Sequence, residues 1–105
     1  VTVEWTSSCS GWNAPRTAPW LARAIDAAGT ASFGSPPCHF GCGGAIPFVN
    51  ALGVRFPAAQ FVITGVLGPG ANAHGPDEFL HLPTAARLTA CVAEILDAHS
   101  SRRGR

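Results

Sequence analysis

A nine-residue apolar stretch, AQFVITGVL at residues 59–67, constrains the fold of this chain more than any other part of the sequence. The stretch lies between Pro57 and Gly68, and its hydrophobic side chains follow one another almost without interruption. A strand that is covered on both faces has this pattern, because neither face can be polar. The stretch therefore predicts a buried strand in a mainly parallel sheet.

The segment that follows, GPGANAHGP at residues 68–76, is rich in glycine and proline and is expected to be a loop. It begins where the predicted strand ends. Ligands of open α/β sheets usually bind beyond the carboxyl ends of the strands. Its position alone makes this loop the candidate site.

Two further strands are expected. Residues 1–5, VTVEW, alternate between apolar and polar, which places Val1, Val3 and Trp5 on one face of a half-buried strand. Residues 38–40 leave room for a short strand that leads into the glycine-rich turn at residues 41–44.

Three helices are expected between and after these strands. The first has Thr17 as its N-cap and Pro19 in its first turn, and it ends at Gly29. The second covers residues 45–52 and ends at Gly53. The alternation of strands and helices with short connections predicts α/β layers.

The third helix opens at Pro83 or Thr84 and is amphipathic. From Ser100 onward we expect disorder. The apolar face of this helix is formed by Leu88, Cys91, Val92, Ile95 and Leu96.

The composition indicates a chain that packs against something larger. Its 105 residues fit one compact domain at most. Hydrophobic residues make up 47% and charged residues 12%, whereas the charged share is usually about 25%. The first residue is Val, as in a processed or excised segment.

The charge pattern argues against nucleic acid or membrane as a partner. The net charge is +1, and the basic residues cluster only at Arg102, Arg103 and Arg105, so no stripe is available to neutralise a phosphate backbone. Apolar stretches are far shorter than the roughly 20 residues that span a bilayer, and no signal segment opens the chain. We expect a soluble, cytoplasmic protein.

Four cysteines allow several interpretations. Cys9, Cys38, Cys42 and Cys91 could form two disulfides, or Cys38 and Cys42 could ligate zinc. No second ligand pair follows at a matching interval, which argues against a zinc knuckle. We expect buried free thiols.

His74 is the residue of the candidate loop with the clearest chemistry. It stands between small residues and Pro76, with Asn72 before it and Asp77 and Glu78 after it. A neutral imidazole nitrogen binds zinc well, and a catalytic site adds further ligands and an open position for water. From the residues alone, His74 is either a metal ligand or a structural histidine.

Two motifs resemble the signatures of one enzyme family: FGCGGAIPF at residues 40–48 and NAHGPDEFL at residues 72–80. In this order and separation they look like those of the zinc amidohydrolase and peptidase family of carnosine dipeptidases, aminoacylases and desuccinylases, peptidase family M twenty. The resemblance extends from Val1 to about His99.

The resemblance implies a partial three-layer α/β/α fold with a mostly parallel sheet, the C-terminal portion of a zinc-peptidase catalytic domain. Residues 1–12 would be the end of a lid-domain strand and a crossing loop. Residues 13–99 would be the C-terminal part of the catalytic domain, and residues 100–105 a disordered tail.

The resemblance also implies roles for individual residues. His74 would be the last metal ligand of a site that holds two zinc ions in the complete enzyme. Gly43, Gly44 and Ala45 would bind the substrate's carboxylate at a helix N-terminus, where unpaired N–H groups favour an anion. Asn72 would shape the loop on the substrate side.

Departures from the family pattern bear on these roles. Ala45 lacks the hydroxyl that family members carry, and Cys42 stands where many carry Glu, which weakens or alters carboxylate recognition. Asp77 replaces the usual Asn and adds a negative charge near the metal, while Glu78 would anchor the loop. A tight turn that serves only packing is the alternative for residues 43–45.

The resemblance implies hydrolysis of the amide bond of dipeptides or N-acyl amino acids. The other metal ligands and the general-base Glu of the family come from the N-terminal half of the catalytic domain. We therefore expect a fragment that contributes no catalytic residue, is inactive alone, and pairs with the missing half.

Two other readings remain open. One is a non-catalytic, self-associating α/β module from a truncated gene, motivated by the low charge and partial sheet. The other is a metal or redox site at Cys38 and Cys42.

Overall fold

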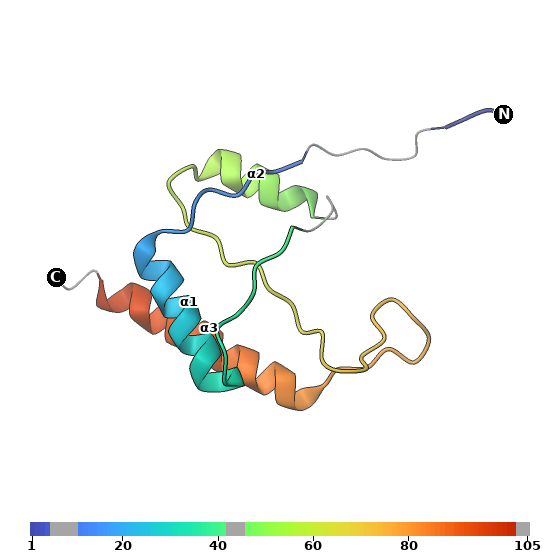
Figure 1. Cartoon of the computed structure of the whole chain (residues 1–105). Helices are drawn as coiled ribbons and strands as arrows, with labels where there is room; N and C mark the ends of the chain where they lie inside the picture. The colour runs from blue at the N-terminus through green and yellow to red at the C-terminus, as the bar shows by residue number, and fades with distance from the viewer. Residues whose placement is uncertain (5–10, 42–45, 103–105) are drawn as a thin grey trace. The chain divides into compact units, whose positions relative to one another are not determined.

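The computed structural model describes residues 1–4, 11–41 and 46–102. Its elements are α1 (Pro19–Phe33), α2 (Pro47–Arg55) and α3 (Leu82–Ser101), shown in Figure 1. The chain divides into two compact units. One combines Val1–Arg16 with His39–Phe61 and contains α2, and the other combines Thr17–Cys38 with Val62–Arg105 and contains α1 and α3.

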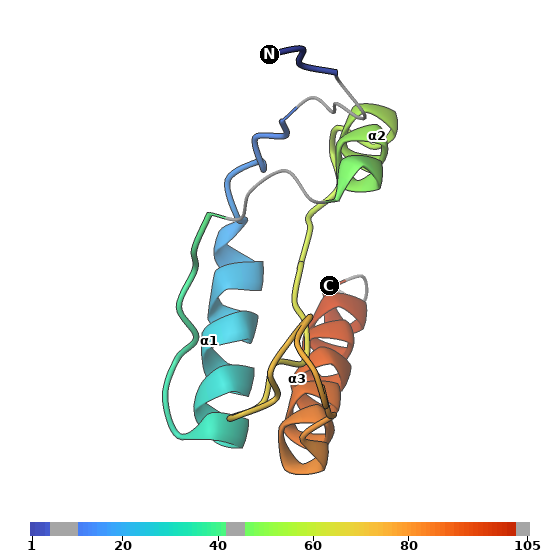
Figure 2. The same cartoon turned by 90° about the vertical axis from the view of Figure 1, so that its right-hand side faces the viewer.

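The core of the second unit lies between α1 and α3, which run side by side (Figure 2). Leu21, Ala28 and Gly29 are buried on α1, and Cys91 is buried on α3. The thiol of Cys91 donates a hydrogen bond of 3.2 Å to the main-chain oxygen of Ala28. Small residues at this point let the two helices approach closely.

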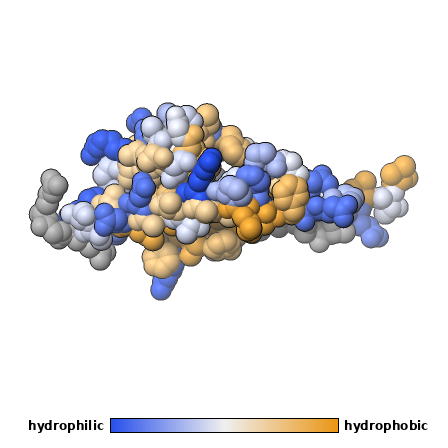
Figure 3. Space-filling model, turned by 90° about the horizontal axis from the view of Figure 1, so that it is seen from below, coloured by the Kyte–Doolittle hydropathy of each residue, from blue (hydrophilic) through white to orange (hydrophobic). Residues whose placement is uncertain are grey.

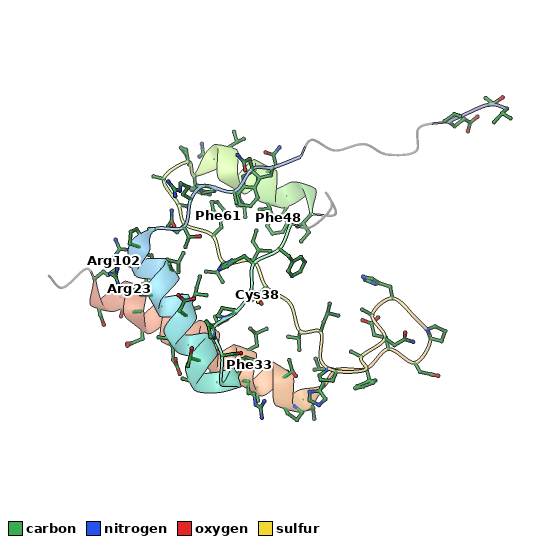
Figure 4. All side chains as sticks on the ribbon, viewed as in Figure 1. Arg23, Phe33, Cys38, Phe48, Phe61 and Arg102 are labelled. Atoms are coloured by element: carbon green, nitrogen blue, oxygen red, sulfur yellow. The ribbon has the colours of Figure 1, made fainter. Side chains whose placement is uncertain are left out.

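Ring contacts at the two ends of the pair show that the helices are antiparallel. Near the start of α1, the Trp20 ring contacts His99 at a centroid distance of 5.4 Å, and the Arg102 guanidinium lies 4.1 Å from the Trp20 centroid. At the other end, Arg87 lies 5.9 Å from the ring of Phe33. Figure 4 labels Arg102 and Phe33, which lie at opposite ends of α1. The two arginines thus lie over aromatic rings at the two ends of the interface between α1 and α3.

The helix α1 begins and ends at residues with clear roles. Its N-cap is Ala18, which supplies no side-chain hydrogen bond, and Pro19 suits the first turn because its fixed φ is helical. Gly34 ends the helix at φ 81°, and its N–H donates to the oxygen of Thr30. A left-handed C-cap of this kind favours glycine.

The first predicted helix therefore needed two corrections. Ala18, not Thr17, is the N-cap. Gly29 does not end the helix but lies inside it, against Pro37: a Cβ at Gly29 would be 2.6 Å from the Pro37 Cδ. The glycine serves close packing between segments rather than termination.

In the first unit, α2 packs on aromatic side chains. Trp12 meets Phe61 edge to face at 5.0 Å, and Val49 of α2 is buried. The helix continues past Gly53 to Arg55, and Gly53 lies against the Trp12 ring, where a Cβ would overlap it. The prediction that Gly53 ends this helix was wrong for the same reason as at Gly29.

The predicted α/β/α sheet is wrong: within residues 1–4, 11–41 and 46–102 the structure contains helices and irregular segments but no strand. Residues 59–67 are irregular, as are residues 1–4 and 38–40, and Trp5 lies outside the described residues. A buried strand needs neighbours that bond its N–H and C=O groups. The described part of this chain offers no such neighbours, so the apolar segment does not form a strand of a sheet.

With no strand among the described residues, apolar side chains lie at the surface, and some of them are visible in Figure 3. Ile63 is 54% exposed and Leu67 is 70% exposed, and Val62 is exposed as well. Burying such side chains would stabilise a fold by about 1.5–3 kcal/mol each.

The last helix, α3, begins at Leu82 and extends through Ser101, past the residue where disorder was expected. Of its predicted apolar face, Cys91 is buried and Leu88 and Ile95 are half-buried, whereas Val92 and Leu96 are exposed. Among the described residues, no helix combines the length and hydrophobicity needed to cross a bilayer.

Candidate functional site

The candidate loop, predicted at residues 68–76, extends to residue 81 in the structure and joins the irregular apolar segment to α3 in the second unit (Figure 1). Two main-chain hydrogen bonds close its base. The N–H of Ala71 donates to the oxygen of Gly68, and the N–H of Phe79 donates to the oxygen of Ala71, both at 3.2 Å. Ala71 is only 3% exposed, so the base of the loop is anchored in the unit.

His74 lies at the outer part of this loop with its side chain exposed. Its backbone has φ 61°, in the left-handed region that few non-glycine residues adopt. The N–H of His74 donates to Glu78 Oε2 at 3.1 Å. The backbone is thus held by Glu78, as the resemblance implied for this residue, while the imidazole faces solvent.

Asn72 shapes the same turn through both its side chain and its main chain. Its Nδ2 donates to the oxygen of Pro76 at 2.6 Å, and its own main-chain oxygen accepts from the N–H of Gly75 at 2.9 Å. A Cβ at Gly75 would lie 2.6 Å from the Asn72 amide, so a larger residue there would displace that side chain. The amide nitrogen of Asn72 is engaged inside the loop.

The loop holds three non-glycine residues at positive φ: Asn72 at 54°, His74 at 61° and Asp77 at 56°. Asn, Asp and His tolerate this conformation better than other residues, because their short polar side chains bond locally. The local hydrogen bonds of Asn72 and Glu78 compensate for the backbone cost. The arrangement holds the backbone of His74 in its left-handed conformation.

The second predicted site cannot be placed beside the first. Gly43, Gly44 and Ala45 lie outside the described residues, as do Cys42 and Cys9. The helix that follows them, α2, has Ile46 as its N-cap and begins at Pro47.

A metal site is not complete within the described residues. These residues contain no group of three or more His, Cys, Asp or Glu side chains close enough to hold a metal ion. Zinc sites use three or four protein ligands. The described part of the chain therefore does not form a complete zinc site by itself.

The cysteines that the structure describes differ from each other. Cys91 is a buried free thiol, as predicted. Cys38 is free but exposed, so the prediction of burial was wrong at that position.

His81 has a role that the sequence analysis missed. It is the N-cap of α3, and its Nδ1 accepts a hydrogen bond of 3.3 Å from the N–H of Thr84. The Thr84 hydroxyl also lies 2.8 Å from Nδ1. Pro83 was the available signal: proline favours the first helical turn, which places the cap one or two residues before it. Histidine is not among the preferred caps, so the role went unrecognised.

No protein-family profile matches this chain. Over 56 residues it is 39% identical to a cysteinylglycine-S-conjugate dipeptidase from Corynebacterium striatum. The matched stretch is 53% of this chain and 12% of the dipeptidase. The chain therefore resembles part of a peptidase and spans about an eighth of its length.

Proposed function

We propose that this chain is the C-terminal part of a zinc-dependent dipeptidase or amidohydrolase that cleaves the amide bond of dipeptides or N-acyl amino acids. His74 binds one of two zinc ions, and the turn at Gly43, Gly44 and Ala45 binds the substrate's carboxylate. The similarity to a dipeptidase supports the reaction class. The observation that carries the role of His74 is its fixed backbone and exposed side chain.

The position of His74 in the loop suits a metal ligand better than a structural histidine. A histidine buried for structural reasons bonds its ring nitrogens, whereas the side chain of His74 is exposed. Its backbone is held by Glu78, and Asn72 closes the turn around it. Fixing a ligand's backbone in advance lowers the entropy that metal binding must overcome.

Further polypeptide supplies the remaining ligands in this proposal. Bound zinc would polarise the scissile carbonyl and lower the pKa of a bound water. The contribution of this chain is to present one imidazole from the loop and to position a carboxylate. The single ligand and the 12% match both favour a longer parent protein.

Hydrolysis tests the proposal. The parent protein is assayed with a cysteinylglycine S-conjugate and with an N-acetyl amino acid, with and without zinc. We expect zinc-dependent cleavage that falls at least a hundredfold in His74→Ala, as expected for loss of a metal ligand, and persists in His39→Ala. His39 is also an exposed histidine, so it is the matched control. Full activity of His74→Ala would overturn the assignment, and zinc-dependent turnover by the 105-residue chain alone would overturn the claim that it is incomplete.

The exposed apolar segment at residues 62–67 favours a second candidate. Val62, Ile63 and Leu67 are exposed, and exposed apolar patches mark interaction surfaces. In the main proposal the rest of the parent protein covers them, and in the alternative a second copy of the chain does. Sedimentation velocity of the pure chain over a hundredfold concentration range distinguishes the two, because a monomer throughout would exclude the self-associating module.

A further inference from the structure

The antiparallel pairing of α1 and α3 brings basic side chains together at the end of the pair where α1 begins. Trp20 of α1 contacts His99 and Arg102, with 4.1 Å between the Arg102 guanidinium and the centroid of the indole ring. Arg23 follows Trp20 by one turn, so it lies on the same side of α1. Figure 4 labels Arg23 and Arg102 at this end of the pair. We call Trp20, Arg23, His99 and Arg102 the basic patch.

The contact with Trp20 presents Arg102 for binding. A guanidinium over an aromatic ring uses its face for that contact, whereas its N–H donors lie in its plane and stay available to a ligand. Arg102 and Arg23 are exposed and Trp20 is half-buried, so the ring is anchored while the cations reach solvent. A side chain that is held in place beforehand loses less conformational entropy when it binds.

Positive charge predominates around the basic patch. The first turn of α1 contains no acidic residue, and the last turn of α3 is basic. Asp97 lies five positions before Arg102, which places it on another side of α3. Asp26 lies one turn beyond Arg23 on α1, and exposed pairs at this spacing are weak. The two guanidiniums are therefore open to a stronger anionic partner.

We propose that the basic patch binds an acidic segment of a partner polypeptide, with one carboxylate paired to Arg102 and another to Arg23. A guanidinium matches a carboxylate through two parallel hydrogen bonds. Nucleic acid is the poorer fit, because a phosphate backbone needs a longer row of cations than these two arginines. In the sequence Arg103 and Arg105 follow Arg102, and their charge steers an acidic partner to this end. The proposal does not depend on the proposed hydrolytic function.

Fluorescence anisotropy of a labelled hexaglutamate peptide tests the basic patch. The peptide is titrated with the 105-residue chain, and we expect saturable binding that weakens as salt is raised to about 0.15 M. Arg102→Gln and Arg23→Gln should each weaken binding about two- to fivefold, the size of one exposed ion pair. Trp20→Leu keeps the charge but removes the ring beneath Arg102, so it should weaken binding as well.

Arg87→Gln is the matched control. Arg87 is an exposed arginine over the ring of Phe33 at the opposite end of the pair, so its removal changes the net charge equally and should leave the affinity unchanged. Equal losses in Arg87→Gln and Arg102→Gln would indicate attraction by net charge alone and would overturn the proposal. It would also be overturned by absence of binding at low salt, by full affinity of Trp20→Leu, or by tighter binding of a hexathymidylate than of hexaglutamate.

Discussion

The Sγ of Cys91 lies 3.2 Å from the main-chain oxygen of Ala28 and donates a hydrogen bond to it, which joins α1 to α3 across 63 positions of sequence. Ala28 is 1% exposed and Cys91 is 6% exposed. Both side chains are small, which allows α1 and α3 to approach each other closely.

Enlarging Ala28 should therefore destabilise the chain. We expect Ala28→Leu to lower the free energy of unfolding by about 1–3 kcal/mol, because added methylenes force a packed interface apart. The measurement is urea denaturation followed by circular dichroism. Ala27→Leu is the matched control, since Ala27 is exposed on the same helix and should change stability by less than about 0.5 kcal/mol. Equal losses in the two variants would contradict the packing described.

The effect of Gly29→Ala on stability should change sign when Pro37 is replaced. Alanine in a helix interior is ordinarily about 0.5–1 kcal/mol more favourable than glycine. Here its Cβ would lie 2.6 Å from the Pro37 Cδ, so Gly29→Ala should destabilise instead. In a Pro37→Gly background the same substitution should stabilise. Thermal unfolding of the four chains measures both effects, and stabilisation with Pro37 present would show that the contact is absent.

The C-cap of α1 depends on the left-handed conformation of Gly34 at φ 81°. Gly34→Ala should cost about 1–2 kcal/mol, because a Cβ clashes with the following carbonyl in this region. Gly34→Asn should cost less, since asparagine tolerates it. Chemical denaturation should rank the free energies of unfolding in the order glycine, asparagine, alanine at position 34. An alanine variant as stable as the unchanged chain would contradict this prediction.

Asn72 should control the shape of the candidate loop. Asn72→Ala removes the hydrogen bond to the Pro76 oxygen and leaves a residue poorly suited to φ 54°. Asn72→Gly removes the same bond but suits the backbone. We expect the protection of the Gly75 amide to fall in both and further in the alanine variant, by about fivefold or more. Hydrogen exchange measures this protection. Unchanged protection of the Gly75 amide in both variants would show that the side-chain amide of Asn72 does not hold the turn.

The sequence predicted helices well where the pattern is local. Residues near 19–33 and 82–101 have helical periodicity and prolines in their first turns, and both form helices. The ends were less predictable because Gly29 and Gly53 serve contacts with Pro37 and Trp12, which are distant in sequence. A glycine that ends a helix and a glycine that lets another segment approach the helix cannot be told apart in the sequence.

The predicted sheet failed for a different reason. The apolar run at residues 59–67 indicates burial, but hydrogen bonds to neighbouring strands make a strand, and those neighbours are a property of other segments. The described residues contain no such neighbours. Ile63 and Leu67 consequently lie exposed instead of inside a sheet.

The site was predictable in part. The composition of residues 68–76 indicated a loop that presents His74, and the structure contains this loop. The positive φ values at Asn72, His74 and Asp77 and the cap formed by His81 depend on atomic contacts that composition does not reveal. The role of His74 as a ligand stays a prediction.

Zinc titration calorimetry tests whether His74 is a metal ligand. The chain, His74→Ala and the control His39→Ala are each titrated alone and within the parent protein. We expect tight zinc binding by the parent protein and by His39→Ala, with loss of one bound zinc ion or at least a tenfold weaker affinity in His74→Ala. Identical zinc stoichiometry and affinity in His74→Ala and its parent would contradict it.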